Sequence, residues 1–153
     1  MILLVILIFC SSAHAANWTE YETRSSNDTY YYDSTSTKIK KFSNGVKYIQ
    51  VWEKTELESP RYTNRHLSNC GAYSSSLCNK PYISVKSISY YDCWGDKIGT
   101  GKSLYYNSKG EVVDQYDFSV NTNSSYSWWE VIPDSVGEGK LKEICRAYRN
   151  KLK

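Results

Sequence analysis

The sequence predicts an α+β fold in which a disulfide-braced antiparallel sheet is packed by one C-terminal helix. Strand-forming Thr, Tyr, Val and Ile residues and turn-forming pairs dominate the chain up to residue 116. Apolar residues then recur at helical spacing near the C-terminus. Cysteines follow an apolar N-terminal segment, which indicates export to a compartment where disulfides form. A chain of 153 residues has room for one such domain.

The N-terminal residues 1–15 have the features of a signal peptide. Residues 2–9 are apolar, and the small residues after them end in Ala13-His14-Ala15, the A-x-A pattern after which signal peptidases cut. Because this apolar run is too short to cross a bilayer comfortably, we expect a cleaved leader and not a retained transmembrane helix. The mature domain is then residues 16–153, with no transmembrane segment of its own.

Alternating polar and apolar residues predict strands in the first half of the mature chain, residues 18–48. Asn44-Gly45 separates residues 39–42 from the apolar run at 46–52, and this dipeptide is the strongest short-range hairpin signal. A hairpin with its turn at Asn44-Gly45 is therefore expected.

The second half predicts another hairpin after a long connection. Residues 58–81 carry two prolines and few aliphatic residues, which predicts an exposed loop. Strand character resumes at residues 82–94, with a change of apolar phase that indicates a bulge. The turn at Asn107-Ser108-Lys109-Gly110 then separates the strands expected at 98–106 and 111–116.

A single helix is predicted at the C-terminus, after a turn-rich connection at residues 121–127. Ser135 and Glu138 have the spacing of a capping box, which marks a helix start. The residues that recur at helical spacing after it are Leu141, Ile144, Cys145, Tyr148 and Leu152. The side that packs on the sheet therefore also presents a thiol.

Of the five cysteines, Cys70, Cys78, Cys93 and Cys145 remain after the leader, an even number that predicts two disulfides. Three pairings are possible. We favour Cys70 with Cys78, because the Gly- and Ser-rich stretch between them can bring its ends together, and Cys93 then pairs with Cys145. A zinc site is not expected, because the chain has no C-x-x-C motif and His66 is the one histidine beyond the leader.

Charge and motifs argue against nucleic-acid binding and catalysis. The balance of 19 basic against 16 acidic residues gives a net charge of only +3, too small to imply a nucleic-acid partner. A phosphate-binding loop and a nucleophile motif around His66 are both missing, so neither an enzyme nor a cofactor is expected. A hydrolase is the remaining alternative, and it requires carboxylates to converge in a pocket, the candidates being Glu56, Glu58, Asp114 and Asp117.

Aromatic and basic residues are the candidate binding surface. The chain has 15 tyrosines and 5 tryptophans, several of them consecutive, and consecutive strand residues place one ring inward and one outward. Lysines also gather around the expected Asn44-Gly45 hairpin. The residues singled out are Tyr31, Tyr90, Tyr105, Trp128, Lys38, Lys40, Lys41 and Lys47. The high content of aromatic residues would be explained equally well by their ordinary preference for strands. The cluster of lysines would be explained by the protection of an edge strand against aggregation.

Several segments resemble the surface-adhesin protein E family of Gram-negative bacteria. They are Trp18, Tyr31-Tyr32-Asp33, Val51-Trp52-Glu53-Lys54, Tyr91-Asp92-Cys93, Gly110-Glu111-Val112-Val113, and the closing segment Trp129-Glu130-Val131-Ile132-Pro133-Asp134-Ser135-Val136-Gly137-Glu138 with Cys145. The resemblance spans most of the mature chain except residues 58–81. It implies a sheet of about six antiparallel strands packed by one C-terminal helix, and the Cys93 to Cys145 bridge.

The resemblance also implies a function. The founding adhesin binds host extracellular-matrix and plasma proteins such as vitronectin, laminin and plasminogen, and it can form a dimer. The chain departs from it at Cys10, because bulky Phe9 stands where lipid attachment needs a small residue. We therefore expect a secreted or envelope protein, in the periplasm or on the outer surface, that binds a protein or glycan partner and can form a homodimer. A periplasmic structural or stress-related protein without a host ligand is the alternative.

Overall fold

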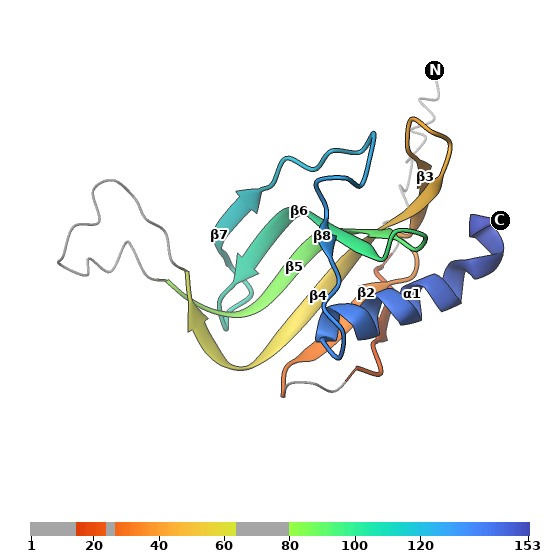
Figure 1. Ribbon diagram of the computed structural model, residues 1–153. Helices are drawn as coiled ribbons and strands as arrows, with labels where there is room; N and C mark the ends of the chain where they lie inside the picture. Colours follow the sequence, from red (N-terminus) through yellow and green to blue (C-terminus); the bar gives the residue numbers. More distant parts are fainter. Residues whose placement is uncertain (1–14, 24–26, 64–79) are drawn as a thin grey trace, which may run out of the picture.

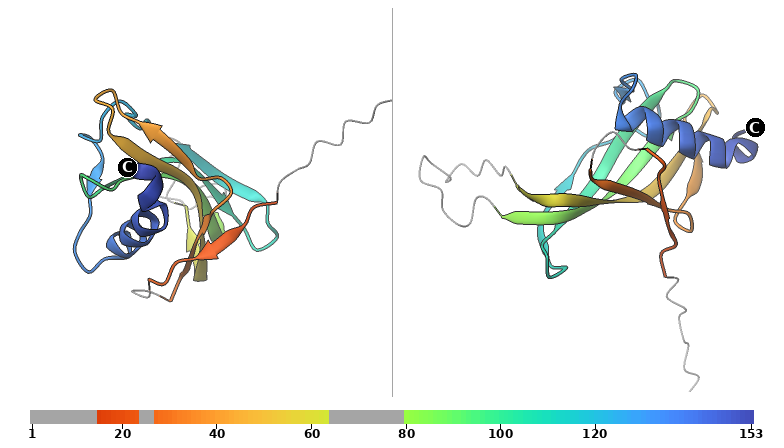
Figure 2. Two further views of the ribbon diagram at one scale, coloured as in Figure 1. Left: turned by 90° about the vertical axis from the view of Figure 1, so that its right-hand side faces the viewer. Right: turned by 90° about the horizontal axis from the view of Figure 1, so that it is seen from below.

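The computed structural model describes residues 15–23, 27–63 and 80–153. It has a single curved sheet with one helix, α1, on one of its faces (Figures 1 and 2). The elements are β1 (Trp18–Glu20), β2 (Thr29–Asp33), β3 (Lys38–Lys41), β4 (Lys47–Tyr62), β5 (Pro81–Asp92), β6 (Lys97–Tyr106), β7 (Val112–Asp117), β8 (Trp129–Glu130) and α1 (Val136–Leu152). The described residues do not include residues 1–14 of the expected signal peptide, nor His66, Cys70 or Cys78.

The sheet is antiparallel throughout its described part, as predicted. Its main order is β1-β2-β4-β5-β6-β7, while β3 pairs with β4 and β8 pairs with β6. Six strands thus form the continuous path and two short ones complete it. The predicted α+β fold with one C-terminal helix is confirmed.

Both predicted hairpins form. Gly45 has a φ of +83° and Gly110 a φ of +78°, and in both turns glycine supplies a left-handed conformation that other residues adopt at a cost. The expected bulge is also present, because the β5 and β6 register shifts between Ser87 and Ser89.

The predicted loop at residues 58–81 is wrong at both ends. β4 continues to Tyr62, and its Cα partners on β5 include Arg61 with Tyr82 and Tyr62 with Pro81, after a register shift. The β4 residues beyond Leu57 are exposed. Backbone hydrogen bonds hold this paired ribbon outside the core, so a strand forms there without the apolar pattern that identifies buried strands.

The helix begins where the capping box predicts. Ser135 adopts an extended conformation and its hydroxyl accepts a hydrogen bond from the Glu138 amide at 3.2 Å, while the Glu138 carboxylate accepts one from the Asp134 amide at 3.0 Å. The first of these contacts satisfies an amide that the first helical turn leaves free, and the second fixes the chain just before the helix. A disulfide between Cys93, which follows β5, and Cys145 then joins α1 to the sheet, as predicted.

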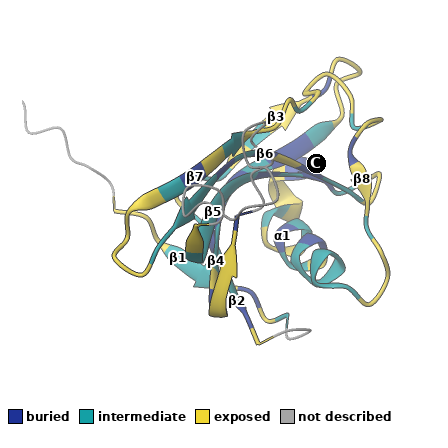
Figure 3. Cartoon of the chain, turned by 90° about the vertical axis from the view of Figure 1, so that its left-hand side faces the viewer, coloured by how far each residue is buried: buried dark blue, intermediate teal, exposed yellow. Residues whose placement is uncertain are grey.

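Two apolar clusters form the core. The larger lies between the sheet and α1, and its fully buried side chains are Tyr91, Ile49, Ile144 and Val51. The smaller consists of Phe42, Tyr48 and Trp128. Figure 3 shows the contrast between the central strands, which are mainly intermediate in burial with buried stretches, and the mostly exposed strand β3 at the edge of the sheet. No helix in the described part is long and apolar enough to span a membrane.

A basic groove along the C-terminal helix

The lysines predicted as a binding surface lie on β3 and at the start of β4. Lys38, Lys40 and Lys41 are exposed, and Lys41 is the cross-strand partner of Lys47. Because side chains alternate along a strand, Lys41 and Lys47 share the face that α1 covers, while Lys38 and Lys40 lie on the opposite face. The predicted lysines therefore surround the β3 edge instead of forming one flat patch.

Lys47 connects this edge to the end of α1. Its ammonium donates hydrogen bonds to the carbonyl oxygens of Lys151, at 3.2 Å, and of Lys153. A cation at the C-terminus of a helix is favourable, because the last carbonyls have no partners within the helix. The contact brings residues more than a hundred positions apart into one basic region.

The helix carries a second basic row. Lys142, Arg146, Arg149 and Lys153 are spaced four, three and four residues apart, so they lie on one helical face. The sequence contained this signal, but attention to the apolar stripe alone missed it. All four side chains line one groove.

This basic groove has a volume of about 420 Å³ and a mixed lining. Leu141, Leu152 and the Cys93–Cys145 disulfide provide apolar surface, while Trp94, 69% exposed, contributes an aromatic wall. The described lining contains a single acidic side chain, Asp96.

Nearby carboxylates offset only part of this charge. Lys142 pairs with Glu138 at 2.7 Å, and Arg146 lies 4.0 Å from Glu22. Both pairs are on the surface, where water screens the interaction and side chains exchange partners easily. The groove therefore offers several cations above an apolar floor, the chemistry that suits an acidic ligand with some apolar surface.

The predicted aromatic residues do not form one surface. Tyr31 on β2 packs with Lys54, whose ammonium is 4.3 Å from the Tyr31 ring centre and 5.4 Å from that of Trp18. Tyr105 lies on β6, with β4 and β5 between it and β2. Tyr90 packs at the rim of the smaller apolar cluster.

The assignment of Trp128 as an exposed ring is wrong. It is only 5% exposed and packs against Phe42 and Tyr48 at ring distances of 5.2 and 5.4 Å. Its neighbour Trp129 is 77% exposed. Alternation along a strand predicts that one of two consecutive rings is buried, but it does not say which one, because the phase depends on what packs against the strand.

A buried polar cluster lies under α1, at the centre of the sheet. The Glu53 carboxylate accepts hydrogen bonds from the hydroxyls of Tyr21 at 2.5 Å, Ser89 at 2.7 Å and Tyr91, and from the Lys140 ammonium at 3.3 Å. Lys140 also lies 4.6 Å from the centre of the Tyr30 ring. A polar group at this depth is stabilised only when its hydrogen-bonding capacity is met, and here four donors meet it.

The charges of this cluster shift the pKa values of its members. Burial would raise the pKa of the Glu53 carboxyl, but the Lys140 charge and the hydroxyl donors outweigh it and hold that pKa below its usual value. Burial and the Glu53 charge raise the pKa values of Tyr21 and Tyr91 well above normal. The cluster thus contains an ionised carboxylate and neutral phenols, enclosed by the sheet and α1, and its role is structural.

The carboxylates proposed for a hydrolase are not brought together. Glu56 and Glu58 are on β4 and Asp114 and Asp117 on β7, and two strands, β5 and β6, lie between them in the sheet order. At about 4.8 Å per strand this separates the two pairs by roughly 14 Å, beyond the carboxylate spacings that glycosidases use. The described acidic residues also do not cluster with cysteines or histidines into a metal site.

Comparison with known protein families shows which family the chain belongs to. Residues 18–146 match the surface-adhesin protein E family.

The chain belongs to the surface-adhesin protein E family.

The match covers nearly the whole described domain, from β1 into α1, and includes the Cys93–Cys145 disulfide and the Glu53 cluster. No curated protein and no solved structure is significantly similar to the chain. Membership in a family of surface adhesins agrees with the expectation of a secreted or surface-exposed binding protein.

Proposed function

We propose that this surface-adhesin protein E family member is an adhesin-like protein of the bacterial envelope that binds an acidic segment of a host matrix or plasma protein in the basic groove. The observation that carries the proposal is the alignment of Lys142, Arg146, Arg149 and Lys153 around an apolar floor with Trp94 at its wall. Arg and Trp are the residues most often found at the energetic centres of protein interfaces.

The charge pattern supports a role in recognition. The chain has a net charge of only +3, yet the described lining of the groove contains four cations and one acidic side chain. A local concentration of charge of one sign speeds the encounter with a partner of opposite charge and disfavours partners of like charge. Lys41 and Lys47 extend the basic surface toward β3, so a partner longer than the groove would meet further cations.

Neutralising the groove is expected to weaken binding to host proteins. The variant R146Q/R149Q should lower the affinity for at least one of immobilised vitronectin, laminin and plasminogen at least tenfold in surface plasmon resonance at physiological salt. Glutamine keeps the helix propensity and a polar side chain while it removes the charge. Wild-type affinity should also fall as salt is raised, because screening weakens charge attraction.

The matched control is K80Q/K109Q, which makes the same change in net charge at two exposed residues that do not line the groove. It should change affinity less than twofold. Equal loss in both double variants would show that net charge alone attracts the partner. If the wild type binds none of the three proteins, the proposal is wrong.

The location of the protein is part of the proposal, and we place it on the outer surface. Protease treatment of intact cells should remove the mature protein while a periplasmic marker survives. If the protein resists the protease until the outer membrane is opened, it is not displayed on the surface. Its partner would then be expected in the periplasm.

A further inference from the structure

The structure has a second groove whose chemistry differs from that of the basic one. It lies over β5 and β6 and is closed by the segment between β7 and β8, with a volume of about 490 Å³. Its described lining has no charged side chain, in a chain in which 23% of the residues are charged. We propose that this neutral groove binds a neutral oligosaccharide.

Hydroxyl groups form part of the groove's surface. Half-buried Ser87 on β5 and exposed Thr100 on β6 supply these hydroxyls, and the Ser87 oxygen lies 2.8 Å from that of Ser103, which is only 3% exposed. When Ser103 donates to Ser87, the Ser87 hydroxyl still has a proton to donate and can accept a further hydrogen bond. Side-chain hydroxyls that can both donate and accept match the hydroxyls of a sugar.

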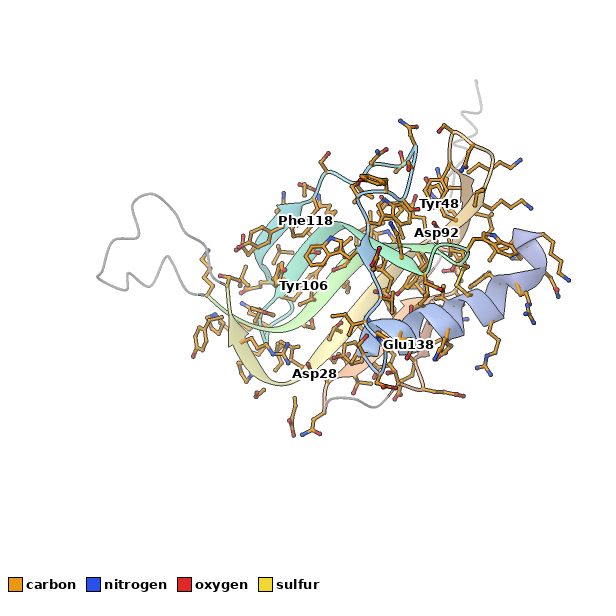
Figure 4. All side chains as sticks on the ribbon, in the orientation of Figure 1. Asp28, Tyr48, Asp92, Tyr106, Phe118 and Glu138 are labelled. Carbon is orange, nitrogen blue, oxygen red and sulfur yellow. A yellow bond between two sulfur atoms is a disulfide. The ribbon has the colours of Figure 1, made fainter. Side chains whose placement is uncertain are left out.

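Aromatic rings provide the walls. Trp129 and Phe118 line the groove with 77% and 51% of their surface exposed, and Tyr105 lines its inner side. Figure 4 places Phe118 beside β7. Rings continue beyond the groove, because Tyr105 packs edge to face on Tyr82 at 4.9 Å and on Tyr116 at 5.5 Å.

The ring walls suit a sugar because an aromatic face carries partial negative charge and attracts the polarised C–H groups of a pyranose face. Apolar contact from the rings and hydrogen bonds from a few hydroxyls are the usual combination in ligand sites of this size. A charged peptide would find no counter-charge in the described lining, whereas a neutral sugar needs none.

The backbone at Trp129 is held in place before any ligand binds. Its neighbour Trp128 is anchored in the smaller apolar cluster and donates a hydrogen bond from its indole N–H to the Asn121 carbonyl at 2.8 Å. Trp129 itself is paired with Ile98 in the β6 and β8 ladder. Because the backbone is held on both sides of this position, a ligand that contacts Trp129 has only the side chain to order, which limits the loss of conformational entropy on binding.

The test uses purified mature protein and three neutral hexasaccharides, namely chitohexaose, maltohexaose and cellohexaose. Saturation-transfer NMR and calorimetry should detect binding of at least one of them. The variant W129A should weaken that binding at least tenfold. The control W94A removes a tryptophan of similar exposure that lines the basic groove, and should change affinity less than twofold.

Three outcomes would overturn the proposal. One is no transfer to any of the three hexasaccharides. Another is equal weakening by W129A and W94A, which would indicate non-specific contact with exposed tryptophan. The third is a wild-type dimer that W129A converts to a monomer, which would identify a second copy of the chain as the occupant of the groove. Because R146Q/R149Q leaves this groove intact, it should bind the sugar as the wild type does, and this separates a failure here from a failure of the basic groove.

Discussion

Lys140→Met is expected to lower the free energy of unfolding at pH 7 by about 3 kcal/mol, because removing one partner of a buried ion pair leaves the other charge uncompensated. Lys140 is the one cation among the donors to Glu53, and both side chains are largely buried, at 14% and 8% exposure. Methionine keeps most of the unbranched aliphatic side chain but removes the ammonium, and with it that group's contacts with the rings of Tyr21 and Tyr30. Urea denaturation followed by tryptophan fluorescence measures the change.

Lys142→Met is the matched control, because it makes the same substitution two positions away on α1. Lys142 pairs with Glu138 at the surface with 71% of its side chain exposed, and we expect no measurable change in stability. Equal destabilisation by both variants would mean that the loss comes from a lysine on α1 in general and not from the buried pair.

The same cluster makes stability depend on pH. The pKa of Glu53 is lowered in the folded protein, while in the unfolded chain it takes the ordinary value of about 4.3. Its contribution to stability is therefore fully present above that value and is lost as the pH falls through the folded pKa. This acid-induced loss should be smaller in Lys140→Met, because the charge that lowers the pKa of Glu53 is gone. An unchanged slope would contradict the conclusion that the Lys140 charge lowers the pKa of Glu53.

Removing the Cys93–Cys145 disulfide with C93A/C145A is expected to cost about 4 kcal/mol of stability, since the bridge closes a loop with a sequence separation of 52 residues. The loop restricts the unfolded chain, and its loss leaves α1 attached to the sheet by packing alone. Urea denaturation of the oxidised proteins measures the difference. A reducing agent should destabilise the wild type more than this variant, which retains only the predicted Cys70–Cys78 bridge.

The predicted bridge between Cys70 and Cys78 supplies the comparison. Its loop is short, so C70A/C78A should cost less, about 2.5 kcal/mol. Loss of equal size in the two double variants would contradict the loop-length argument. Peptide mapping without reduction identifies the Cys70 to Cys78 pairing itself.

Features that depend on neighbouring residues could be predicted from the sequence. The hairpin turns at Asn44-Gly45 and Asn107 to Gly110, and the helix start at Ser135, depend on side chains within a few positions of each other. The Cys93 to Cys145 pairing also followed, because Cys145 shares the apolar face of α1, which must pack on the sheet. In each case the structure depends on residues close together in the sequence, or on the regular spacing of apolar residues along one helix.

The candidate sites required the tertiary structure. Lys47 meets the end of α1 across more than a hundred residues, and the pairing of Glu53 with Lys140 requires the helix to cross that part of the sheet. Trp128 rather than Trp129 is buried because Phe42 and Tyr48 pack against it from another part of the chain. The sequence by itself determined most of the elements, the two hairpin turns and the start of the helix, and it favoured the disulfide that joins helix and sheet. Only long-range packing decided which side chains meet and which rings face solvent, because residue periodicity defines two faces of a strand and leaves open which of them is covered.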